Sequence, residues 1–275
     1  MALKRTISGL LLCCLLCGCG APAQQMEETG SGSAAAPAQQ ETDAADAEPV
    51  DPPIDESVTD ATHADQPLAG MVICLDPGHG VTDARAQERV SPLSQETKAA
   101  YVSGASGASQ TEEELNLAVA QLTQGKLEAL GAQIVMTRTA HAAAVSNIER
   151  AQIANDAGAA LCIRIHADGS EDASASGMSM QVPAGELLGT PEIVQPSEQA
   201  AMYILSAVTE ATGARSRGLT PRSDLTGFNW SEVPCVLLEM GFLSNAQEDT
   251  LLATADYRQK IADGIAQGVC RWVQG

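Results

Sequence analysis

Two kinds of hydrophobic pattern alternate along residues 71–273. Continuous apolar runs bounded by turn residues predict buried strands at 71–75, 132–137, 160–165 and 233–240. Residues 177–182 alternate between apolar and polar, which predicts a strand nearer an edge. Helical spacing predicts helices over 112–130, 146–156, 197–212, 247–253 and 257–273. Ser146 to Glu149 and Ser244 to Gln247 fit capping boxes at the starts of two of them. Strands alternating with helices indicate an α/β fold with a mostly parallel sheet.

Four residues able to carry chemistry lie at the ends of these elements. Asp76-Pro77-Gly78 stops the first strand, so His79 lies just past its carboxyl end. His166 follows the strand at 160–165, and Glu239 ends the last strand. Open α/β sheets usually bind ligands at this edge. Glu112 is the first residue of the predicted helix at 112–130 and lies on the face of that helix that is buried. A carboxylate that points toward the core needs a charged or hydrogen-bonding partner.

Two imidazoles and one carboxylate, with a fourth position for water, form a recurrent ligand set for catalytic zinc. A zinc ion would lower the pKa of its water and polarise a carbonyl oxygen. The remaining carboxylate, Glu239, could then move a proton to a leaving amine. From spacing alone, a zinc site competes with a second interpretation, in which these polar residues only hydrogen-bond one another and stabilise the fold.

Five motifs carry a family resemblance. The segments DPGHG (76–80), TEEELNLAVA (111–120), VMTR (135–138), IRIHADGS (163–170) and VPCVLLEMGFLSN (233–245) together resemble the zinc-dependent N-acetylmuramoyl-L-alanine amidases, the third amidase family of bacterial cell walls. The resemblance implies a mixed sheet of about six strands flanked by helices, His79, Glu112 and His166 as zinc ligands, and Glu239 as the catalytic glutamate. It also implies cleavage between N-acetylmuramic acid and L-alanine of the stem peptide.

The chain departs from the family at two places. Many members have a second glycine after His-Gly, where this chain has Val81. The stretch between His79 and Glu112 is also longer than in compact members. Residues 81–111 have no clear pattern, and so long a loop is either disordered or functional. It could cover and gate whatever His79 binds.

Residues 1–18 have the pattern of a signal peptide. Lys4 and Arg5 precede an apolar run at 7–16 that is too short to span a bilayer. The run ends in Leu-Cys-Gly-Cys, which resembles the lipobox of bacterial lipoproteins and implies cleavage before Cys19 with diacylglycerol on its thiol. Two acyl chains would anchor the protein stably. The alternative is an ordinary secretory signal with incidental cysteines.

Composition divides the remainder into two zones. Residues 19–69 hold eleven acidic residues, no Lys or Arg and no aromatic residue, which predicts an acidic disordered tether. Residues 70–275 are long enough for one catalytic domain. The whole chain carries 35 acidic and 15 basic residues, for a net charge of −20. No basic stripe appears, which argues against a nucleic-acid partner.

Several residues keep two interpretations. Phe228 and Trp230 suit either a substrate groove or the core. Arg164 either lines the groove or forms an ordinary structural salt bridge, and Arg138 either holds a helix or loop or forms such a salt bridge. Four cysteines lie beyond the signal region, and small buried hydrophobic residues are the better interpretation for the first three: Cys74, Cys162, Cys235 and Cys270.

The leading hypothesis is a peptidoglycan amidase outside the cytoplasmic membrane, lipid-anchored to a bacterial membrane. Its expected partners are the glycan and stem peptide, the membrane through lipidated Cys19, and a candidate protein activator. A wall-binding lipoprotein with little catalysis is a second hypothesis, although binding does not need a glutamate behind the metal. A zinc peptidase with another substrate is a third, because it would share the ligands and differ in the loops.

Overall fold

The structure is a computed structural model of the 275-residue chain and describes residues 66–82 and 85–275. The predicted signal peptide, Cys19 and nearly all of the tether lie outside the described residues. In the part of the chain that is described, no helix is long and apolar enough to cross a membrane.

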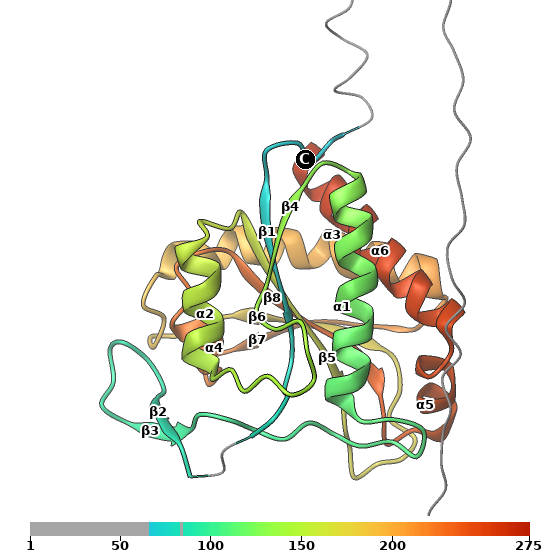
Figure 1. Cartoon of the computed structure of the whole chain (residues 1–275), viewed down its shortest axis with the longest axis horizontal. Helices are drawn as coiled ribbons and strands as arrows, with labels where there is room; N and C mark the ends of the chain where they lie inside the picture. Colours follow the sequence, from blue (N-terminus) through green and yellow to red (C-terminus); the bar gives the residue numbers. More distant parts are fainter. Residues whose placement is uncertain (1–65, 83–84) are drawn as a thin grey trace, which may run out of the picture. The chain divides into compact units, whose positions relative to one another are not determined.

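One sheet of six strands, in the order β4-β1-β5-β8-β6-β7, organises the domain (Figure 1). Within this sheet, as far as the described residues form it, the β6–β8 pairing is antiparallel and the other pairings are parallel. The predicted mixed, mostly parallel sheet flanked by helices is therefore confirmed. The elements are β1 (Val72–Pro77), β2 (Gln87–Arg89), β3 (Thr97–Ala99), α1 (Glu112–Ala129), β4 (Gln133–Met136), α2 (Asn147–Asp156), β5 (Leu161–Asp168), β6 (Met178–Pro183), η2 (Pro191–Ile193), α3 (Val194–Thr212), β7 (Ser216–Arg222), α4 (Thr226–Asn229), β8 (Cys235–Phe242), α5 (Ala246–Leu252) and α6 (Ala255–Gln274).

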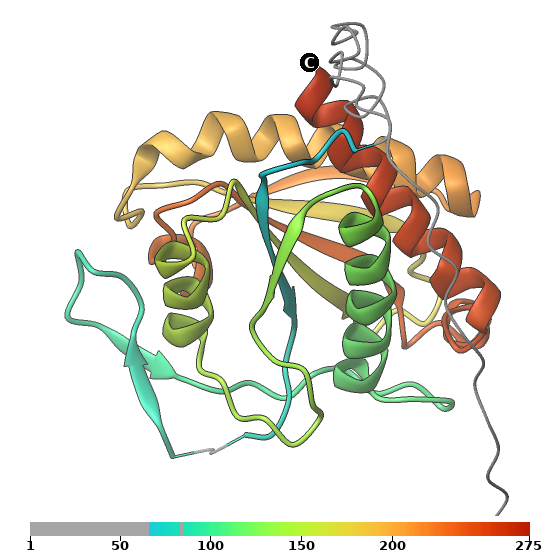
Figure 2. The ribbon, with the colours of Figure 1, turned by 45° about the horizontal axis from the view of Figure 1, so that its top comes forward.

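The central strands are buried on both faces, which explains their continuous apolar runs. Ile73 and Leu75 of β1 belong to a main core that includes residues of α1, α3 and α6. Cys74, between them in sequence, belongs to a smaller core on the other face with residues of α2 and α4. Figures 1 and 2 show α1 and α2 on opposite sides of β1.

The interpretation of the cysteines as small buried hydrophobic residues is confirmed for the first three. Cys162 is the register partner of Cys74 on one side and of Cys235 on the other, and all three are buried with free thiols. Cys270 is a free, half-buried residue on α6. Their place in the smaller core accounts for a row of small side chains across three strands.

The folded domain begins earlier than residue 70. Leu68 was expected in the tether, but its side chain is fully buried in the main core. Its backbone N–H donates to the Leu130 carbonyl oxygen at 3.0 Å. A single apolar residue in a polar stretch gives no periodic signal, so only packing shows where the domain starts.

Residues 81–111 differ from the predicted unpatterned loop. They contain the β2–β3 hairpin, which lies apart from the main sheet, and a β-bridge between Ser106 and Thr111 (Figure 2). The Glu88 carboxylate accepts hydrogen bonds from the Asn147 side chain and from the Ile148 N–H, at 2.8 and 3.0 Å. The hairpin is therefore attached to the first turn of α2, where acceptors are favourable.

Helix ends follow the predicted chemistry with one exception. Ser146 and Glu149 form the predicted capping box at the start of α2. At α5, however, the cap is Asn245, whose side-chain oxygen accepts from Gln247 and Glu248 N–H groups, and the capping box predicted from Ser244 is wrong. The Ser244 hydroxyl instead accepts from the Ser170 N–H.

Candidate metal centre and active site

Strand register brings the four predicted site residues to one edge of the sheet. His166 on β5 is the register partner of Glu239 on β8. The turn after β1 lies beside β5, because the Gly78 N–H donates to the Ile165 carbonyl oxygen at 2.9 Å. This turn presents His79, whose φ of 59° lies in the left-handed region. The first residue of α1, Glu112, is 4% exposed and points inward, as its helical face predicted.

His79, Glu112 and His166 form a group that could hold a metal ion. The Glu112 Oε1 atom lies 3.0 Å from His79 Nε2 and 3.0 Å from His166 Nδ1. One ligand atom from each of the three residues lies within 4.8 Å of the others. Ligand atoms about 2 Å from a tetrahedral zinc lie about 3.3 Å apart, so the spacing fits. His166 Nε2 is buried without a hydrogen-bond partner, so this imidazole has unused binding capacity.

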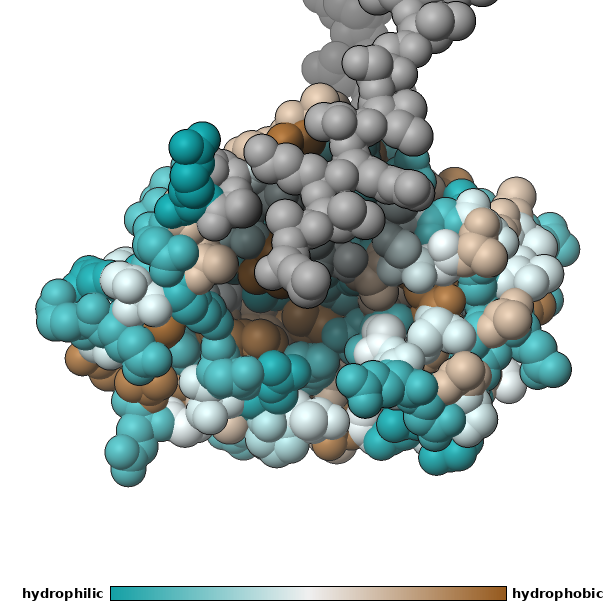
Figure 3. Space-filling model, turned by 90° about the horizontal axis from the view of Figure 1, so that it is seen from below, coloured by the Kyte–Doolittle hydropathy of each residue, from teal (hydrophilic) through white to brown (hydrophobic). Residues whose placement is uncertain are grey.

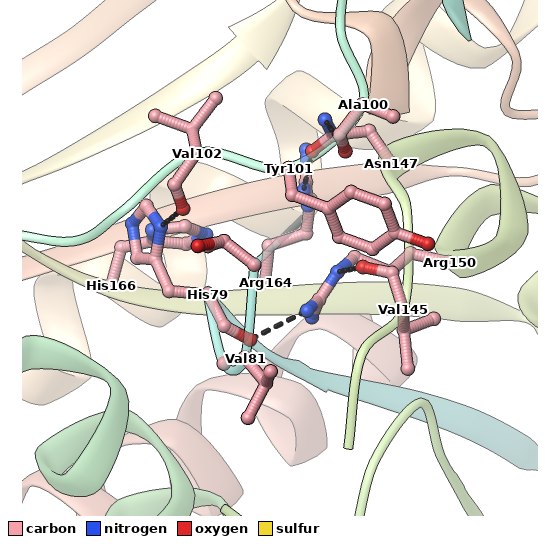
Figure 4. A pocket seen from close by; sticks show the side chains of 12 residues that line it. His79, Val81, Ala100, Tyr101, Val102, Val145, Asn147, Arg150, Arg164 and His166 are labelled. Atoms are coloured by element: carbon pink, nitrogen blue, oxygen red, sulfur yellow. Dashed lines mark hydrogen bonds between the residues drawn. The ribbon is translucent and has the colours of Figure 1, made fainter. Parts of the chain in front are cut away.

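Residues 100–105, here called the strap, hold two of these side chains from outside the sheet. His79 Nδ1 lies 2.7 Å from the Val102 carbonyl oxygen, which makes Nδ1 the donor. Nε2 faces Glu112, so it donates to that carboxylate in the imidazolium and offers a lone pair to a metal in the neutral ring. The Ala105 N–H donates to Glu112 Oε2 at 2.7 Å. Figure 4 shows His79 and His166 side by side, with Val102 next to them. The strap is thus part of the site's support, because such contacts orient metal ligands.

Burial and mutual contacts shift the pKa values of the three candidate ligands. Burial lowers the pKa of His79, but the hydrogen bond to Glu112, the charge of Glu112 and the hydrogen bond to Val102 together outweigh burial, and the net pKa lies above the ordinary 6.5. Burial lowers the pKa of His166 to about 4 despite the same carboxylate. Burial raises the pKa of Glu112, yet the two imidazoles hold it well below its usual range. Glu112 is therefore a carboxylate at neutral pH.

Two arginines clamp the turn that carries His79. Arg150 donates to the Pro77 and His79 carbonyl oxygens at 2.8 and 2.6 Å. Arg138 donates to the Gly78 carbonyl oxygen at 2.9 Å and to that of Glu113 in α1 at 2.7 Å. Arg138 therefore holds a loop and a helix through hydrogen bonds to carbonyl oxygens, which is the first of its two interpretations. Figure 4 shows Arg150 reaching the backbone beside His79.

Asp76 is the anion that balances this cationic region. Its carboxylate is fully buried and pairs with Arg150 at 2.5 Å and with Arg164 at 2.7 Å. Arg164 thus forms a salt bridge and also lines the groove described below. Burial raises the pKa of Asp76, but the two arginines hold it well below the usual range.

Replacing Asp76 by alanine should destabilise the protein strongly. The change leaves Arg150 and Arg164 as buried charges without their anion, which costs about 3–5 kcal/mol. Urea unfolding of the variant and the wild type measures the difference. The matched control is Asp263→Ala, which breaks a surface pair with Lys126 and should change stability by less than about 1 kcal/mol. Equal losses in the two variants would contradict the assignment.

Glu239 lies in a groove of about 420 Å³ that also exposes both histidines. Its Oε1 accepts from the Gln181 side-chain amide at 3.0 Å, while its buried Oε2 has no partner. Burial, followed by the charges of Glu112 and Asp168, raises the pKa of Glu239 well above the ordinary value. The groove is lined by His79, Lys98, Arg164, His166, Gln181, Arg222 and Glu239, among others. Figure 3 looks onto the domain from below, where hydrophilic residues surround a hollow.

Three of these lining residues were missed in the sequence. Lys98 comes from the hairpin, Gln181 from β6 and Arg222 from β7. The polar positions of the alternating segment at 177–182 are the only signal that could have indicated Gln181. Phe228 and Trp230, in contrast, do not line the groove: Phe228 is fully buried in the smaller core, and Trp230 packs under Arg89 of the hairpin.

Comparison with known proteins agrees with this geometry. Residues 73–271 match the family model described as N-acetylmuramoyl-L-alanine amidase. The chain is 30% identical over 210 residues to an N-acetylmuramoyl-L-alanine amidase of Mycobacterium tuberculosis, covering 74% of this chain and 86% of the relative. It is 29% identical to the probable cell wall amidase LytH of Staphylococcus aureus, covering 77% of this chain and 62% of LytH.

Solved structures show the same similarity. The crystal structure of an N-acetylmuramyl-L-alanine amidase from Mycobacterium smegmatis superposes with a TM-score of 0.69 at 28% identity, covering 75% of this chain and 98% of that one. A second amidase, from Mycobacterium abscessus, gives 0.67 at 26% identity, covering 74% and 99%. With the family match over residues 73–271, these findings show that the chain belongs to the N-acetylmuramoyl-L-alanine amidase family and is a hydrolase of that class.

Proposed function

We propose that this amidase cuts the bond between N-acetylmuramic acid and L-alanine in peptidoglycan with a zinc ion held by His79, Glu112 and His166. Glu239 is the catalytic residue, and the reaction serves cell-wall remodelling or autolysis. The observation that carries the proposal is that the three candidate ligands cluster and that two of them, His79 and His166, line one groove together with Glu239. The Glu239 carboxylate has one buried oxygen without a partner. Neither a wall-binding module nor a structural polar set requires that fourth residue.

Each residue has a separate task in this reaction. When bound, zinc supplies a Lewis acid that activates water and polarises the amide carbonyl. Glu239 Oε2 takes a proton from the attacking water and passes it to the amide nitrogen as the C–N bond breaks. The products are the lactyl carboxyl group of the muramyl sugar and an L-alanine amine. Glu239 must be ionised to accept the proton, and a nearby dication favours that form by lowering its pKa.

Zinc affinity should fall about tenfold for each pH unit between about pH 6 and pH 5. A protonated imidazole cannot bind the ion, and the pKa of His79 lies above its ordinary 6.5. His166, with a pKa of about 4, stays neutral over that range, and Glu112 stays ionised. Competition with a chromogenic chelator at several pH values measures the slope. A slope of two protons, or of none, would contradict the assignment.

The proposed location of the protein is the outer side of a bacterial membrane, where diacylglycerol on Cys19 would anchor it. The signal-like segment and lipobox at 1–19 support it, as does the cell-wall role in the name of LytH. The acidic segment at 19–69 then serves as a tether toward the wall. Mass spectrometry of the amino-terminal peptide from membranes tests this proposal, because an unmodified Cys19 or a cut elsewhere would refute the anchor.

Product analysis tests the reaction itself. The full-length chain, with zinc quantified, is incubated with purified peptidoglycan, and new amino termini are identified. Peptides that begin with L-alanine support the amidase, whereas a cut within the stem peptide indicates a peptidase. Bound zinc without any cleavage by the wild type would contradict activity of the isolated chain and would favour either an activator-dependent enzyme or the binding module.

A further inference from the structure

A glutamine side chain connects Glu239 to the edge of the sheet. Gln181 lies on β6, which pairs with β8 so that Ser179 faces Glu239 and Gln181 faces Leu237. From this position the Gln181 Nε2 group donates to Glu239 Oε1 at 3.0 Å. Because Glu239 Oε2 has no partner, this side-chain hydrogen bond is the one that orients the carboxyl group within the described part of the chain.

Arg222 determines which end of the Gln181 amide faces Glu239. The Arg222 Nη1 group donates to Gln181 Oε1 at 2.7 Å. A guanidinium group has donors only, so the carbonyl end of the amide must face Arg222. The NH₂ end is then directed at Glu239. The amide orientation therefore follows from chemistry and not from the assignment of two similar atoms.

Arg222 is itself held in place. Its Nε and Nη2 atoms each donate to the Asp224 carboxylate at 2.8 Å, in a bidentate pair. The Asp224 backbone oxygen accepts from Lys98 of the hairpin. The connection thus runs from the inserted hairpin through β7 and β6 to the glutamate on β8.

We propose that Gln181 is a positioning residue for Glu239 and that Arg222 acts through Gln181. With Oε1 occupied by a donor, only Oε2 is available to take up and release the proton, and Oε2 is the oxygen with no protein partner. The inference rests on the proposed role of Glu239 in amide hydrolysis. It adds two residues that the family motifs in this chain do not contain.

Kinetics with a soluble muramyl peptide test the connection in the full-length, zinc-loaded chain. Gln181→Met keeps the length of the side chain without the amide and should lower kcat about 10- to 100-fold, a part of what proton transfer contributes. KM should change by less than about twofold. Gln121→Met, on an exposed position of α1, is the matched control and should leave kcat unchanged.

Arg222 variants distinguish action through Gln181 from a direct contact with substrate. Arg222→Lys keeps a donor and should retain most activity, while Arg222→Met should approach Gln181→Met. In the double variant, the loss should equal that of Gln181→Met alone, because both changes remove one connection. Additive losses, or a rise in KM as the main effect of Arg222→Met, would overturn the inference.

An NMR experiment tests the hydrogen bonds from Arg222 through Gln181 to Glu239 even if the proposed reaction is wrong. In ¹⁵N–¹H spectra of the full-length chain, the Gln181 side-chain amide is assigned by its loss in Gln181→Met. Its resonances should move in Glu239→Gln and in Arg222→Met, and stay in place in Gln121→Met. Resonances that move in neither site variant would overturn the inference. A wild type that binds zinc and cleaves no muramyl peptide would refute the proposed function instead.

Discussion

Replacing Glu239 by glutamine should lower kcat on peptidoglycan about 10²- to 10⁴-fold while the zinc content stays equal to that of the wild type. The amide keeps the size of the side chain and can still accept from Gln181, but it cannot take up a proton from water. Glu239 is not among the three clustered candidate ligands, so metal binding should survive. Release of L-alanine-headed peptides and metal analysis of the same samples measure the two effects.

Glu232→Gln is the matched control for this experiment, since Glu232 is exposed just before β8. It removes the same charge and should leave both kcat and zinc unchanged. Full activity in Glu239→Gln would refute the catalytic assignment. Loss of zinc in that variant would show that Glu239 also helps to hold the ion.

Replacing Gly78 by alanine should remove metal binding and, with it, activity. A Cβ atom at this position would overlap the ring of His166, which is packed directly against the turn. The ring must move to avoid the overlap, and displaced ligands lose affinity by about 100-fold or more, at the upper end of what lost support of a ligand costs. Zinc titration of the variant measures the loss, and circular dichroism checks that the domain still folds.

Gly125→Ala provides the comparison, because nothing lies within 4 Å of the Cβ position at Gly125 in α1. Alanine favours a helix over glycine by about 1 kcal/mol, so this variant should be at least as stable as the wild type and fully active. Normal zinc affinity in Gly78→Ala would mean that His166 is not a ligand in its observed position.

Local sequence patterns were sufficient to predict an element where the burial of its residues depends on the segment itself. The apolar runs predicted β1, β5 and β8 because strands buried on both faces need apolar side chains throughout. The same runs placed His79 just past the end of β1. The prediction that His166 follows its strand and that Glu239 ends its strand is wrong by two and three residues, because β5 continues to Asp168 and β8 to Phe242. Helical periodicity predicted the inward direction of Glu112, since a residue's face follows from its spacing to the buried stripe.

Other elements had no local signal. The strand β7 reads Ser-Arg-Gly-Leu-Thr-Pro-Arg, which contains no apolar run, so the hydrophobic pattern predicts no strand there. An edge strand gains its hydrogen bonds from a neighbour and needs no apolar face, so its sequence can resemble a loop. The hairpin inside residues 81–111 also lacks a local signal. Its two strands are three residues each and mostly half-exposed, which is too short and too polar for a hydrophobic pattern.

The sequence by itself therefore determined the α/β class and the order of the central elements along the chain, which depend on short-range periodicity. It also placed the four candidate site residues at or near the ends of those elements, while their roles are what the family resemblance implies. Only the tertiary structure decided what surrounds those residues. Val102 beside His79, Gly78 under His166, and Gln181 with Arg222 beside Glu239 are contacts between segments far apart in the chain. Such contacts depend on strand order and register, which local sequence patterns do not encode.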